Sequence, residues 1–312
     1  MAQMSVAGTD RTGGGDAMQK LFCVVGTDAR QRAAGETLRR AGYRVGGAEC
    51  AGSADYILLP MPLEADATGL ARILRAAKPG ALALGGRVSL PVEEAARCAG
   101  VELVDYFLRP ELETLNAVPT AEGCLSLLLQ LRDCTIWESG FLVLGYGRIG
   151  RAVARRIALL GGRVTVAVRS AEQRAAARCA GYRAAPLDAL PTLLSVTDTV
   201  INTIPAPVLG REQLVCLPQD ALIIDLASRP GGTDFAAARK LDLHAEHALS
   251  LPARCAPRTA GALVAQTVLS ILRERGDGDA AQQGERRGVS GRCGTGPTAG
   301  PAVSAPERSD EP

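Results

Sequence analysis

Short apolar runs alternate with stretches of helical periodicity along most of the chain. Apolar runs at residues 20–26, 56–60 and 81–84 have the character of buried strands, and the stretches between them repeat their apolar positions at helical spacing. The alternation continues through residue 275. Because this order is typical of parallel strands connected by helices, it predicts an α/β protein built on doubly wound parallel sheets.

The strongest local pattern lies near the middle, where the apolar run 141–144 ends on Gly-x-Gly-x-x-Gly and a helical pattern follows. Gly145 permits a tight turn, Gly147 lets the backbone approach a pyrophosphate, and Gly150 allows the helix to pack closely on the strand. A helix N-terminus presents free N–H groups to phosphates, so the motif predicts a Rossmann-type dinucleotide site. We expect it to consist of Gly145, Tyr146, Gly147, Arg148, Ile149 and Gly150.

The following strand, at 163–168, indicates which cofactor is bound. About twenty residues past the glycines, where an NAD site carries an acid for the ribose 2′-hydroxyl, the chain has Arg169 and Ser170. An arginine beside a hydroxyl suits a 2′-phosphate. The sequence therefore favours NADP over NAD, with NAD still possible, and the alternative is that Arg169 is a solvated loop residue.

Two later strands end in polar residues at the same predicted edge of the sheet. Ligands bind outside the carboxyl ends of the strands in open parallel sheets, so these ends are predicted to contact the nicotinamide or its ribose. The expected cofactor-binding residues here are Asn202, Thr203, Ile204, Pro205 and Asp225. The loop 228–234 that follows is rich in Gly and Pro and is either a plain turn or a wall of the ligand site.

A helix is predicted to start near Pro119, with Thr120 and Glu122 in its first turn. It would link the two domains, so its first turn, with Asn116 just before it, would lie at an interdomain cleft. The alternative is that Thr120 and Glu122 only cap the helix. For Arg30, near the start of the first helix, a solvated position is favoured over one facing the cleft.

A second candidate anion site lies before the last amphipathic helix. Thr259 falls in the first turn of that helix, and Arg258 precedes it, so N–H groups and a cation would lie together. His244 and His247 do not predict a metal site, because they fall on opposite sides of a strand edge and no acid or cysteine completes a ligand set.

Composition narrows the possible functions. The net charge of +2 argues against a nucleic-acid partner, and aromatic residues at 3% are too few for base-stacking platforms. The nine unpatterned cysteines are expected to be reduced thiols. With neither a signal peptide nor an apolar stretch long enough to span a bilayer, we expect a soluble cytoplasmic protein.

The same patterns predict the domain organisation. Residues 1–19 and the low-complexity tail 276–312 are expected to be disordered. Residues 20–115 are expected to form a smaller flavodoxin-like α/β domain on the substrate side. Residues 116–275 are expected to hold the linker helix, the NADP-binding Rossmann domain and the C-terminal helix.

Several segments together resemble the family of dipicolinate synthase A chains, which acts in sporulation. The resemblance covers residues 20–275, and its most specific parts are Pro-Thr-Ala-Glu-Gly at 119–123 and Ser-Arg-Pro-Gly-Gly-Thr-Asp-Phe at 228–235. The other segments that carry it are 26–31, 116–118, 144–150, 201–205, 224–227 and 256–261. The family usually has Gly where Ala253 stands, and Lys is common at Arg229 and Arg258, whose planar fork differs from an ammonium group.

The resemblance implies NADP-dependent oxidation of dihydrodipicolinate to pyridine-2,6-dicarboxylate, in the mother cell of a spore-forming bacterium. It also implies a partner, the second, flavoprotein-like subunit of dipicolinate synthase, and we expect a homo-oligomer. The substrate would lie in the interdomain cleft with its ring facing the nicotinamide, and Arg229, Glu122 or Asp234 would serve catalysis. The candidate substrate-binding residues are Asn116, Thr120, Ser228, Arg229, Arg258 and Thr259.

Two other functions fit parts of the pattern. Arg229 follows an apolar strand as the substrate arginine of 2-hydroxyacid dehydrogenases does, but that chemistry needs a histidine base well downstream, and no histidine follows His247. A scaffold that binds NADP(H) and supports the second subunit without chemistry also remains open.

Overall fold

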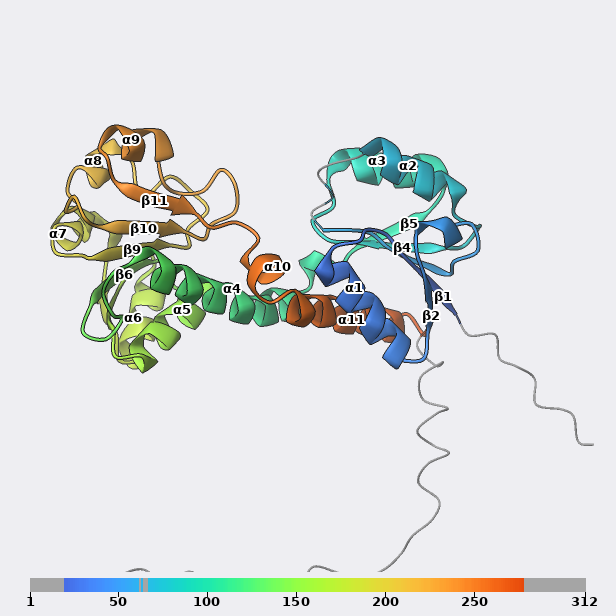
Figure 1. Ribbon diagram of the computed structural model, residues 1–312, viewed down its shortest axis with the longest axis horizontal. Coiled ribbons are helices and arrows are strands. Elements are labelled where there is room, and N and C mark those ends of the chain that lie inside the picture. Colours follow the sequence, from blue (N-terminus) through green and yellow to red (C-terminus); the bar gives the residue numbers. More distant parts are fainter. Residues whose placement is uncertain (1–19, 62, 64–66, 278–312) are drawn as a thin grey trace, which may run out of the picture.

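The structure, a computed structural model, describes residues 20–61, 63 and 67–277. Two parallel sheets form two lobes, and long helices run between them (Figure 1). The segments expected to be disordered, 1–19 and 276–312, lie outside the described residues apart from Gly276 and Asp277.

The first sheet has the strand order β2-β1-β3-β4-β5, with every pair parallel. This order, 2-1-3-4-5, is the flavodoxin-like arrangement, as predicted. Its strands are β1 (Leu21–Val24), β2 (Arg44–Gly46), β3 (Tyr56–Leu58), β4 (Leu82–Gly85) and β5 (Glu102–Asp105). Its helices are α1 (Ala29–Arg40), α2 (Ala67–Ala76) and α3 (Leu90–Ala99), with short 3-10 turns η1 (Ala48–Cys50) and η2 (Tyr106–Leu108).

The second sheet has the order β11-β10-β9-β6-β7-β8, again with every pair parallel. If the strands are numbered within this domain, so that β6 becomes strand 1, the order reads 6-5-4-1-2-3. This is the dinucleotide-binding Rossmann order 3-2-1-4-5-6 read from the opposite edge of the sheet. Its strands are β6 (Gly140–Leu144), β7 (Arg163–Ala167), β8 (Arg183–Ala185), β9 (Thr199–Asn202), β10 (Leu222–Asp225) and β11 (His244–His247). Its helices are α5 (Arg148–Leu159), α6 (Ala171–Cys179), α7 (Leu190–Leu194), α8 (Arg211–Leu214) and α9 (Phe235–Lys240), with the 3-10 turn η3 (Leu187–Ala189).

Alternating side chains of the inner strands enter cores on opposite faces of each sheet, which explains the continuous apolar runs in the sequence. In β1, Phe22 and Val24 lie in a cluster with α1, whereas Cys23 joins a cluster on the other face. In β6, Phe141 and Val143 face α5, whereas Leu142 and Leu144 face the α7–α9 side. Strands buried on both faces leave only their ends free to contact ligands.

Asp55 connects two strands and a loop at the amino end of the first sheet. Its carboxylate accepts a hydrogen bond from the Leu21 N–H at 2.7 Å and another from Lys78 Nζ at 2.8 Å. Burial by itself raises the pKa of Asp55, but these hydrogen bonds and the charges of Lys78 and Lys20 outweigh it, so the pKa lies below its ordinary value. The charged form of Asp55 therefore stabilises the fold.

Helix α4 (Pro110–Leu131) belongs to both lobes. Leu112, near its start, lies in the core of the first lobe, while Leu127 and Leu128, near its end, lie in the core of the second. The predicted start near Pro119 is wrong, because the helix begins at Pro110 and contains Pro119 within it. The polar residues around Pro119 resemble a helix start, but burial of α4 against two cores overrides that local signal.

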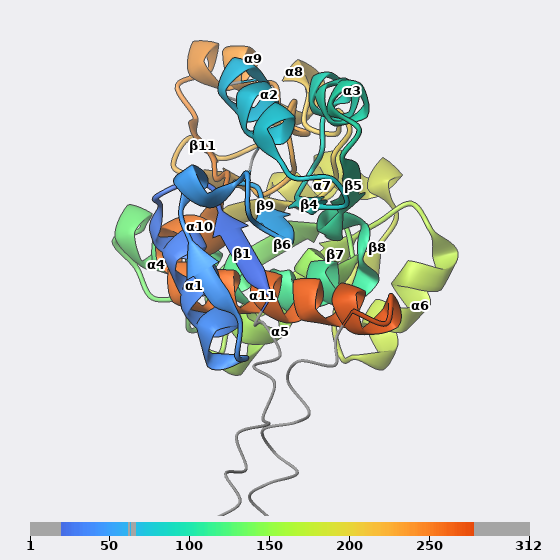
Figure 2. The same cartoon turned by 90° about the vertical axis from the view of Figure 1, so that its right-hand side faces the viewer.

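The chain returns to the first lobe through α10 (Leu251–Cys255) and α11 (Pro257–Glu274), which lies beside α1 (Figure 2). Val264, Val268 and Ile271 of α11 enter the core of the first sheet. A Cβ at Gly261 would lie 2.8 Å from the Ala33 Cβ and would overlap the Arg30 carbonyl oxygen, so glycine permits this close helix contact. The C-terminal helix, which the expected boundaries group with residues 116–275, thus packs on the first lobe.

Candidate active site in the interdomain cleft

A cleft of about 880 Å³ lies between the lobes. Most of its walls are the segments that follow the carboxyl ends of strands in both sheets, where ligands of open α/β sheets bind, and the rest come from α4 and from Gln173 of α6. From the first lobe come Arg30, Met61, Arg87 and Phe107. From the second come residues 145–149, 168–170, 203–205, 226, 228, 229 and 248–253.

The glycine turn has the geometry that a dinucleotide needs. Gly145 has a φ of 92°, and Gly147 is the N-cap of α5. A Cβ at Gly147 would meet no atom of the described chain within 4 Å, whereas a Cβ at Gly150 would overlap the Gly145 carbonyl oxygen. The first N–H groups of α5 therefore face open space, as phosphate binding requires.

The carboxyl end of β7 brings Arg169 and Ser170 to the cleft. Ser170 caps α6 by accepting the Gln173 N–H, and Arg174 Nη1 donates to the Arg169 carbonyl oxygen at 2.8 Å. These contacts hold the backbone of the turn. The exposed Arg169 side chain makes no hydrogen bond or ion pair within the described residues, so it is free to meet an anion.

Three of the four candidate residues at the end of β9 line the cleft, and the fourth is buried in the domain. Thr203, Ile204 and Pro205 line the cleft, and Thr203 Oγ1 donates to the Leu144 carbonyl oxygen at 2.8 Å. Asn202 is fully buried and, contrary to expectation, does not line the cleft.

Asp225, expected to bind the cofactor, is likewise fully buried and outside the cleft. It accepts hydrogen bonds from Asn202 Nδ2 at 2.9 Å and from the N–H groups of Ala227 at 2.9 Å and Gly232 at 2.8 Å. A buried carboxylate needs such donors, so Asp225 and Asn202 shape the loop after β10. That loop presents Ser228 and Arg229 and is a cleft wall.

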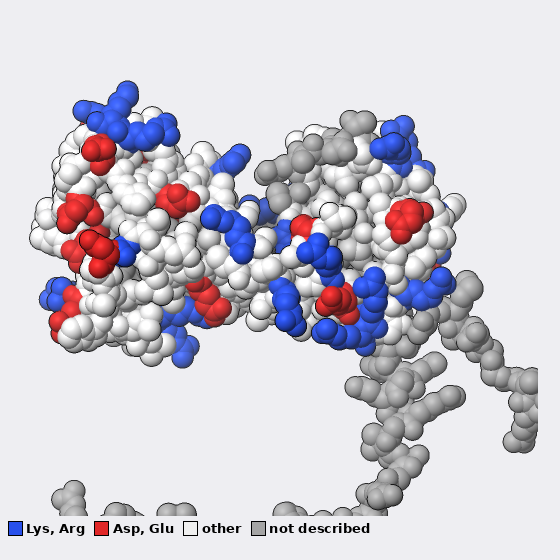
Figure 3. Space-filling view, in the orientation of Figure 1, with Lys and Arg blue, Asp and Glu red and all other residues white. Residues whose placement is uncertain are grey.

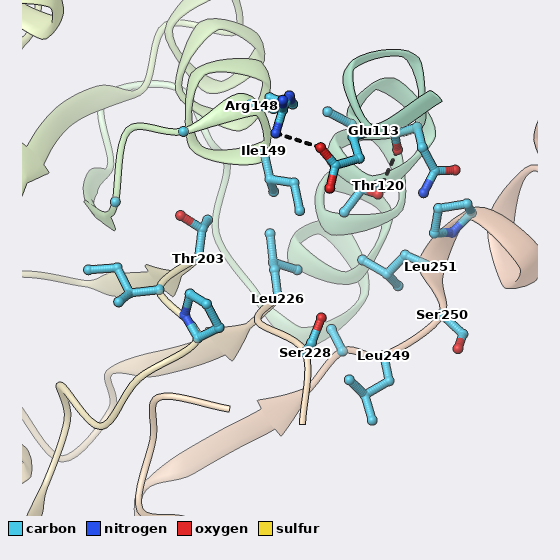
Figure 4. Close-up of a pocket in the computed structure, with 18 of the residues that line it drawn as sticks. Glu113, Thr120, Arg148, Ile149, Thr203, Leu226, Ser228, Leu249, Ser250 and Leu251 are labelled. Carbon is cyan, nitrogen blue, oxygen red and sulfur yellow. Dashed lines mark hydrogen bonds and ion pairs between the residues drawn. The ribbon is translucent and has the colours of Figure 1, made fainter. Parts of the chain in front are cut away.

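One face of α4 lines the cleft with Glu113, Asn116 and Thr120 (Figure 4). Glu113 pairs with Arg148 at 2.8 Å, and Thr120 Oγ1 donates to the Asn116 carbonyl oxygen at 2.7 Å, so Thr120 is not an N-cap. Glu122 points elsewhere, because residues two apart on a helix do not share a face. It pairs with Arg156 at 3.3 Å outside the cleft.

Three further candidates also lie outside the cleft. Asp234 caps α9 by accepting the N–H groups of Ala236 and Ala237. Arg258 and Thr259 are exposed at the start of α11, which is directed toward α1. The segment just before them, residues 248–253, lines the cleft instead.

Sequence reasoning missed Glu113, Arg87 and Phe107 and favoured a solvated Arg30. Arg30 is only 7% exposed and lines the cleft. Arg87 Nη2 reaches across the cleft and donates to Ser228 Oγ at 2.8 Å. Glu113 lies three residues before Asn116 and seven before Thr120, a spacing that places the three side chains on one helix face. This spacing would have predicted Glu113 only if the helix had been expected to begin at Pro110.

The cleft is strongly cationic. Its described lining holds one carboxylate, Glu113, against five arginines: Arg30, Arg87, Arg148, Arg169 and Arg229. In the space-filling view, basic side chains lie on both sides of the hollow between the lobes (Figure 3). Burial, with Tyr182 nearby, raises the pKa of the Tyr146 hydroxyl against the opposing charge of Arg151, so Tyr146 stays neutral at pH 7. Because arginines outnumber carboxylates among the described lining residues, the lining suits ligands with several negative charges.

Neither a metal site nor a catalytic histidine is found in the described part of the cleft. No group of three His, Cys, Asp or Glu side chains suited to a metal occurs among the described residues. His247 contacts the Ala227 carbonyl oxygen at 3.0 Å and stacks on Phe235, and none of the described lining residues is a histidine. No helix in the described ranges is long and apolar enough to cross a membrane.

Comparison with known proteins agrees with this geometry. The NAD-binding domain model of D-isomer specific 2-hydroxyacid dehydrogenases matches residues 130–231. The crystal structure of the dipicolinate synthase A chain from Bacillus subtilis has 30% sequence identity and a TM-score of 0.73, and the match covers 82% of this chain and 96% of that chain. The chain belongs to the family of dipicolinate synthase A chains.

Two further matches support this membership. The corresponding dipicolinate synthase structure from Bacillus halodurans superposes with a TM-score of 0.75 at 28% identity, over 81% of this chain and 97% of that one. The dipicolinate synthase A chain of Bacillus subtilis (strain 168) is 39% identical over 183 residues, which are 59% of this chain and 62% of the relative's length. The resemblance seen in the sequence is confirmed, and so are the Rossmann and flavodoxin-like folds.

Proposed function

We propose that this chain oxidises dihydrodipicolinate to pyridine-2,6-dicarboxylate with NADP as the acceptor. The observation that carries the proposal is the cleft itself. It joins a dinucleotide turn of the 2-hydroxyacid dehydrogenase type to an unusually cationic lining, in a chain of the dipicolinate synthase family. A dicarboxylate substrate supplies the negative charges that this lining lacks.

The reaction removes two hydrogens from the ring of the substrate. A ring carbon loses a hydride, which the nicotinamide accepts when the cofactor is bound, and a ring proton leaves to a base or to water. Formation of the aromatic ring supplies much of the driving force. The chain must therefore bind both carboxylates, orient the ring and accept a proton.

The positions in the cleft suggest which residues perform these tasks. Arg229 binds a carboxylate, and Asn116, Thr120 and Ser228 supply polar contacts around it. Glu113 replaces Glu122 and Asp234 as the proposed proton acceptor, because it is the one carboxylate among the described lining residues. Its ion pair with Arg148 directs it toward the glycine turn.

The cofactor is proposed to bind along the carboxyl edge of the second sheet. The first N–H groups of α5 would hold the pyrophosphate, and Arg169 and Ser170 would hold the 2′-phosphate. Thr203, Ile204 and Pro205, which also line the cleft, would contact the nicotinamide half of the cofactor. Residues 20–115 together with α11 form the substrate side.

By its membership of the family, we propose that the chain works with the second, flavoprotein-like subunit of the synthase in a spore-forming bacterium, and that it forms homo-oligomers. The matched family model leaves hydroxyacid chemistry as a rival, but that chemistry needs a histidine base, which the described lining does not contain. A cofactor-binding scaffold is the other rival.

A coupled assay separates these functions. Dihydrodipicolinate is generated in situ and mixed with the purified chain and NADP⁺ or NAD⁺, with and without the flavoprotein-like subunit, while nicotinamide reduction and pyridine dicarboxylate absorbance are followed. We expect equal amounts of reduced cofactor and pyridine dicarboxylate. Tight NADPH binding with no product under any condition would contradict the proposal and favour the scaffold, and oxidation of 2-hydroxyacids instead would favour the dehydrogenase rival.

A further inference from the structure

Arg30 is a buried cation on the cleft wall, with no counter-ion among the described residues. It is 7% exposed, and its guanidinium makes no hydrogen bond or ion pair within that part of the chain. The nearest acid in sequence, Asp28, already accepts the N–H groups of Arg30 and Gln31 as the cap of α1. Arginine stays protonated in proteins, and none of the Arg30 guanidinium nitrogens is a buried unsatisfied atom, so the charged end of a largely covered side chain reaches the cleft. This position is therefore suited to an anion from outside.

Arg87 is a second cation of the first lobe, held in a fixed direction. Its backbone has a φ of 56°, and Asp105 holds the turn by accepting the N–H groups of Arg87 at 3.2 Å and Val88 at 2.9 Å. Its guanidinium lies over the Phe107 ring, 4.9 Å from the centroid. A left-handed backbone at a non-glycine residue is strained, and such strain concentrates at ligand sites.

The only hydrogen-bond partner of the Arg87 side chain in the described chain is Ser228 Oγ, a neutral hydroxyl on the opposite lobe. Most of its donors therefore remain available. Ser228 precedes Arg229 and both line the cleft, so the contact joins the cation of the first lobe to the segment that carries the cation of the second. Two groups of arginines thus face one cleft from its two walls.

The cofactor does not account for the arginines of the first lobe. Its phosphates are assigned to the glycine turn and to Arg169, both in the second lobe, and a nicotinamide carries no negative charge to pair with Arg30. A substrate with one carboxylate would be served by Arg229 alone. The two carboxylates of the proposed substrate flank the ring nitrogen and point away from each other, so cations on two walls of the cleft can each bind one.

We propose that Arg30 and Arg87 bind one carboxylate of the substrate while Arg229 binds the other, so that the dicarboxylate bridges the two lobes. This inference rests on the proposed function. It makes the arginines of the first lobe the determinants of specificity for dicarboxylates over monocarboxylates. When the substrate binds, charge-assisted hydrogen bonds from Arg87 to its carboxylate replace the hydrogen bond from Arg87 to Ser228.

Calorimetric titration of the full chain, saturated with NADP⁺, tests the inference. The probes are pyridine-2,6-dicarboxylate and pyridine-2-carboxylate, each added to the wild type, Arg30→Gln, Arg30→Lys and Arg87→Gln. Arg40→Gln on α1 and Arg97→Gln on α3 are matched controls, because each removes one exposed arginine from the same lobe. The thermal midpoint of each variant reports its folding, and the exposed Arg87 can be replaced without disturbing a core.

We expect the wild type to prefer the dicarboxylate by about tenfold or more, the size of one charge-assisted hydrogen bond. Arg30→Gln and Arg87→Gln should bind both probes with similar affinity, Arg30→Lys should recover part of the preference, and both controls should keep it. A wild type without the preference, or Arg→Gln variants that retain it, would overturn the inference. If the preference depends on these arginines but dihydrodipicolinate is not oxidised, the proposed function fails while the dicarboxylate subsite stands.

Discussion

Two glycine-to-alanine substitutions in the glycine turn should have different effects, one on cofactor binding and the other on the stability of the fold. Gly147→Ala adds a methyl group that meets no atom of the described chain within 4 Å, at a φ of −78° that alanine adopts readily. Gly150→Ala adds a Cβ 3.0 Å from the Gly145 carbonyl carbon and closer still to its oxygen. The first change should therefore affect the ligand and the second should affect the fold.

The magnitudes follow from these contacts. At Gly150 the added methyl group meets backbone atoms, which cannot rotate aside, so overpacking lowers the free energy of unfolding by about 3 kcal/mol. The higher helix propensity of alanine raises it again by about 1 kcal/mol. The net loss of about 2 kcal/mol lowers the thermal midpoint by about 4–8 °C. Gly147→Ala should unfold within about 1 °C of the wild type but bind NADPH about tenfold more weakly, because its methyl group occupies the approach to the phosphates.

Both effects are measurable on the purified chain. Thermal unfolding followed by circular dichroism without cofactor gives the stability of each variant, and quenching of protein fluorescence by NADPH gives its affinity. The reasoning would be refuted if Gly147→Ala bound NADPH as tightly as the wild type, or if Gly150→Ala were as stable as the wild type.

Three further outcomes are expected. Arg169→Glu should weaken NADPH binding by about tenfold and leave NADH binding nearly unchanged. The control Arg178→Glu, in the last turn of the adjoining helix α6, should alter the binding of neither cofactor. Equal losses of affinity for both cofactors in Arg169→Glu would contradict the assignment of the 2′-phosphate to Arg169. Glu113→Gln should lower kcat by about a hundredfold and Glu122→Gln by less than about twofold, and the reverse order would return the proton acceptor to Glu122. Asp55→Asn should destabilise the fold by about 1.5–3 kcal/mol at pH 7. Because the pKa of Asp55 is lowered by folding, this difference should be complete above its ordinary value of 3.8 and shrink as the pH falls through the folded pKa, which urea unfolding at several pH values would show.

Local signals predicted most of the fold. Strands buried on both faces appear as unbroken apolar runs, and each glycine of the turn has a local geometric reason, so the Rossmann and flavodoxin-like sheets were predictable. Residues directly after strand ends, such as Thr203, Ser228 and Arg229, were also placed at the cleft, because parallel strands deliver their carboxyl ends to one edge.

What the sequence did not predict depends on contacts between distant segments. The return of α11 to the first lobe is determined by its packing on α1, which no local pattern reports. Asn202 lies at a strand end but points into the interior, where it meets Asp225. Glu122 and Glu113 lie on one helix, and only the orientation of α4 between two cores decides which of them faces the cleft.

The central claim is that one cleft binds both the nicotinamide cofactor and a pyridine dicarboxylate. A crystal structure of the chain with NADP⁺ and pyridine-2,6-dicarboxylate tests it most directly. The account predicts the two rings facing each other in the cleft, with one carboxylate at Arg229 and the other at Arg30 and Arg87. A dicarboxylate bound elsewhere on the protein, with NADP⁺ alone in the cleft, would contradict it.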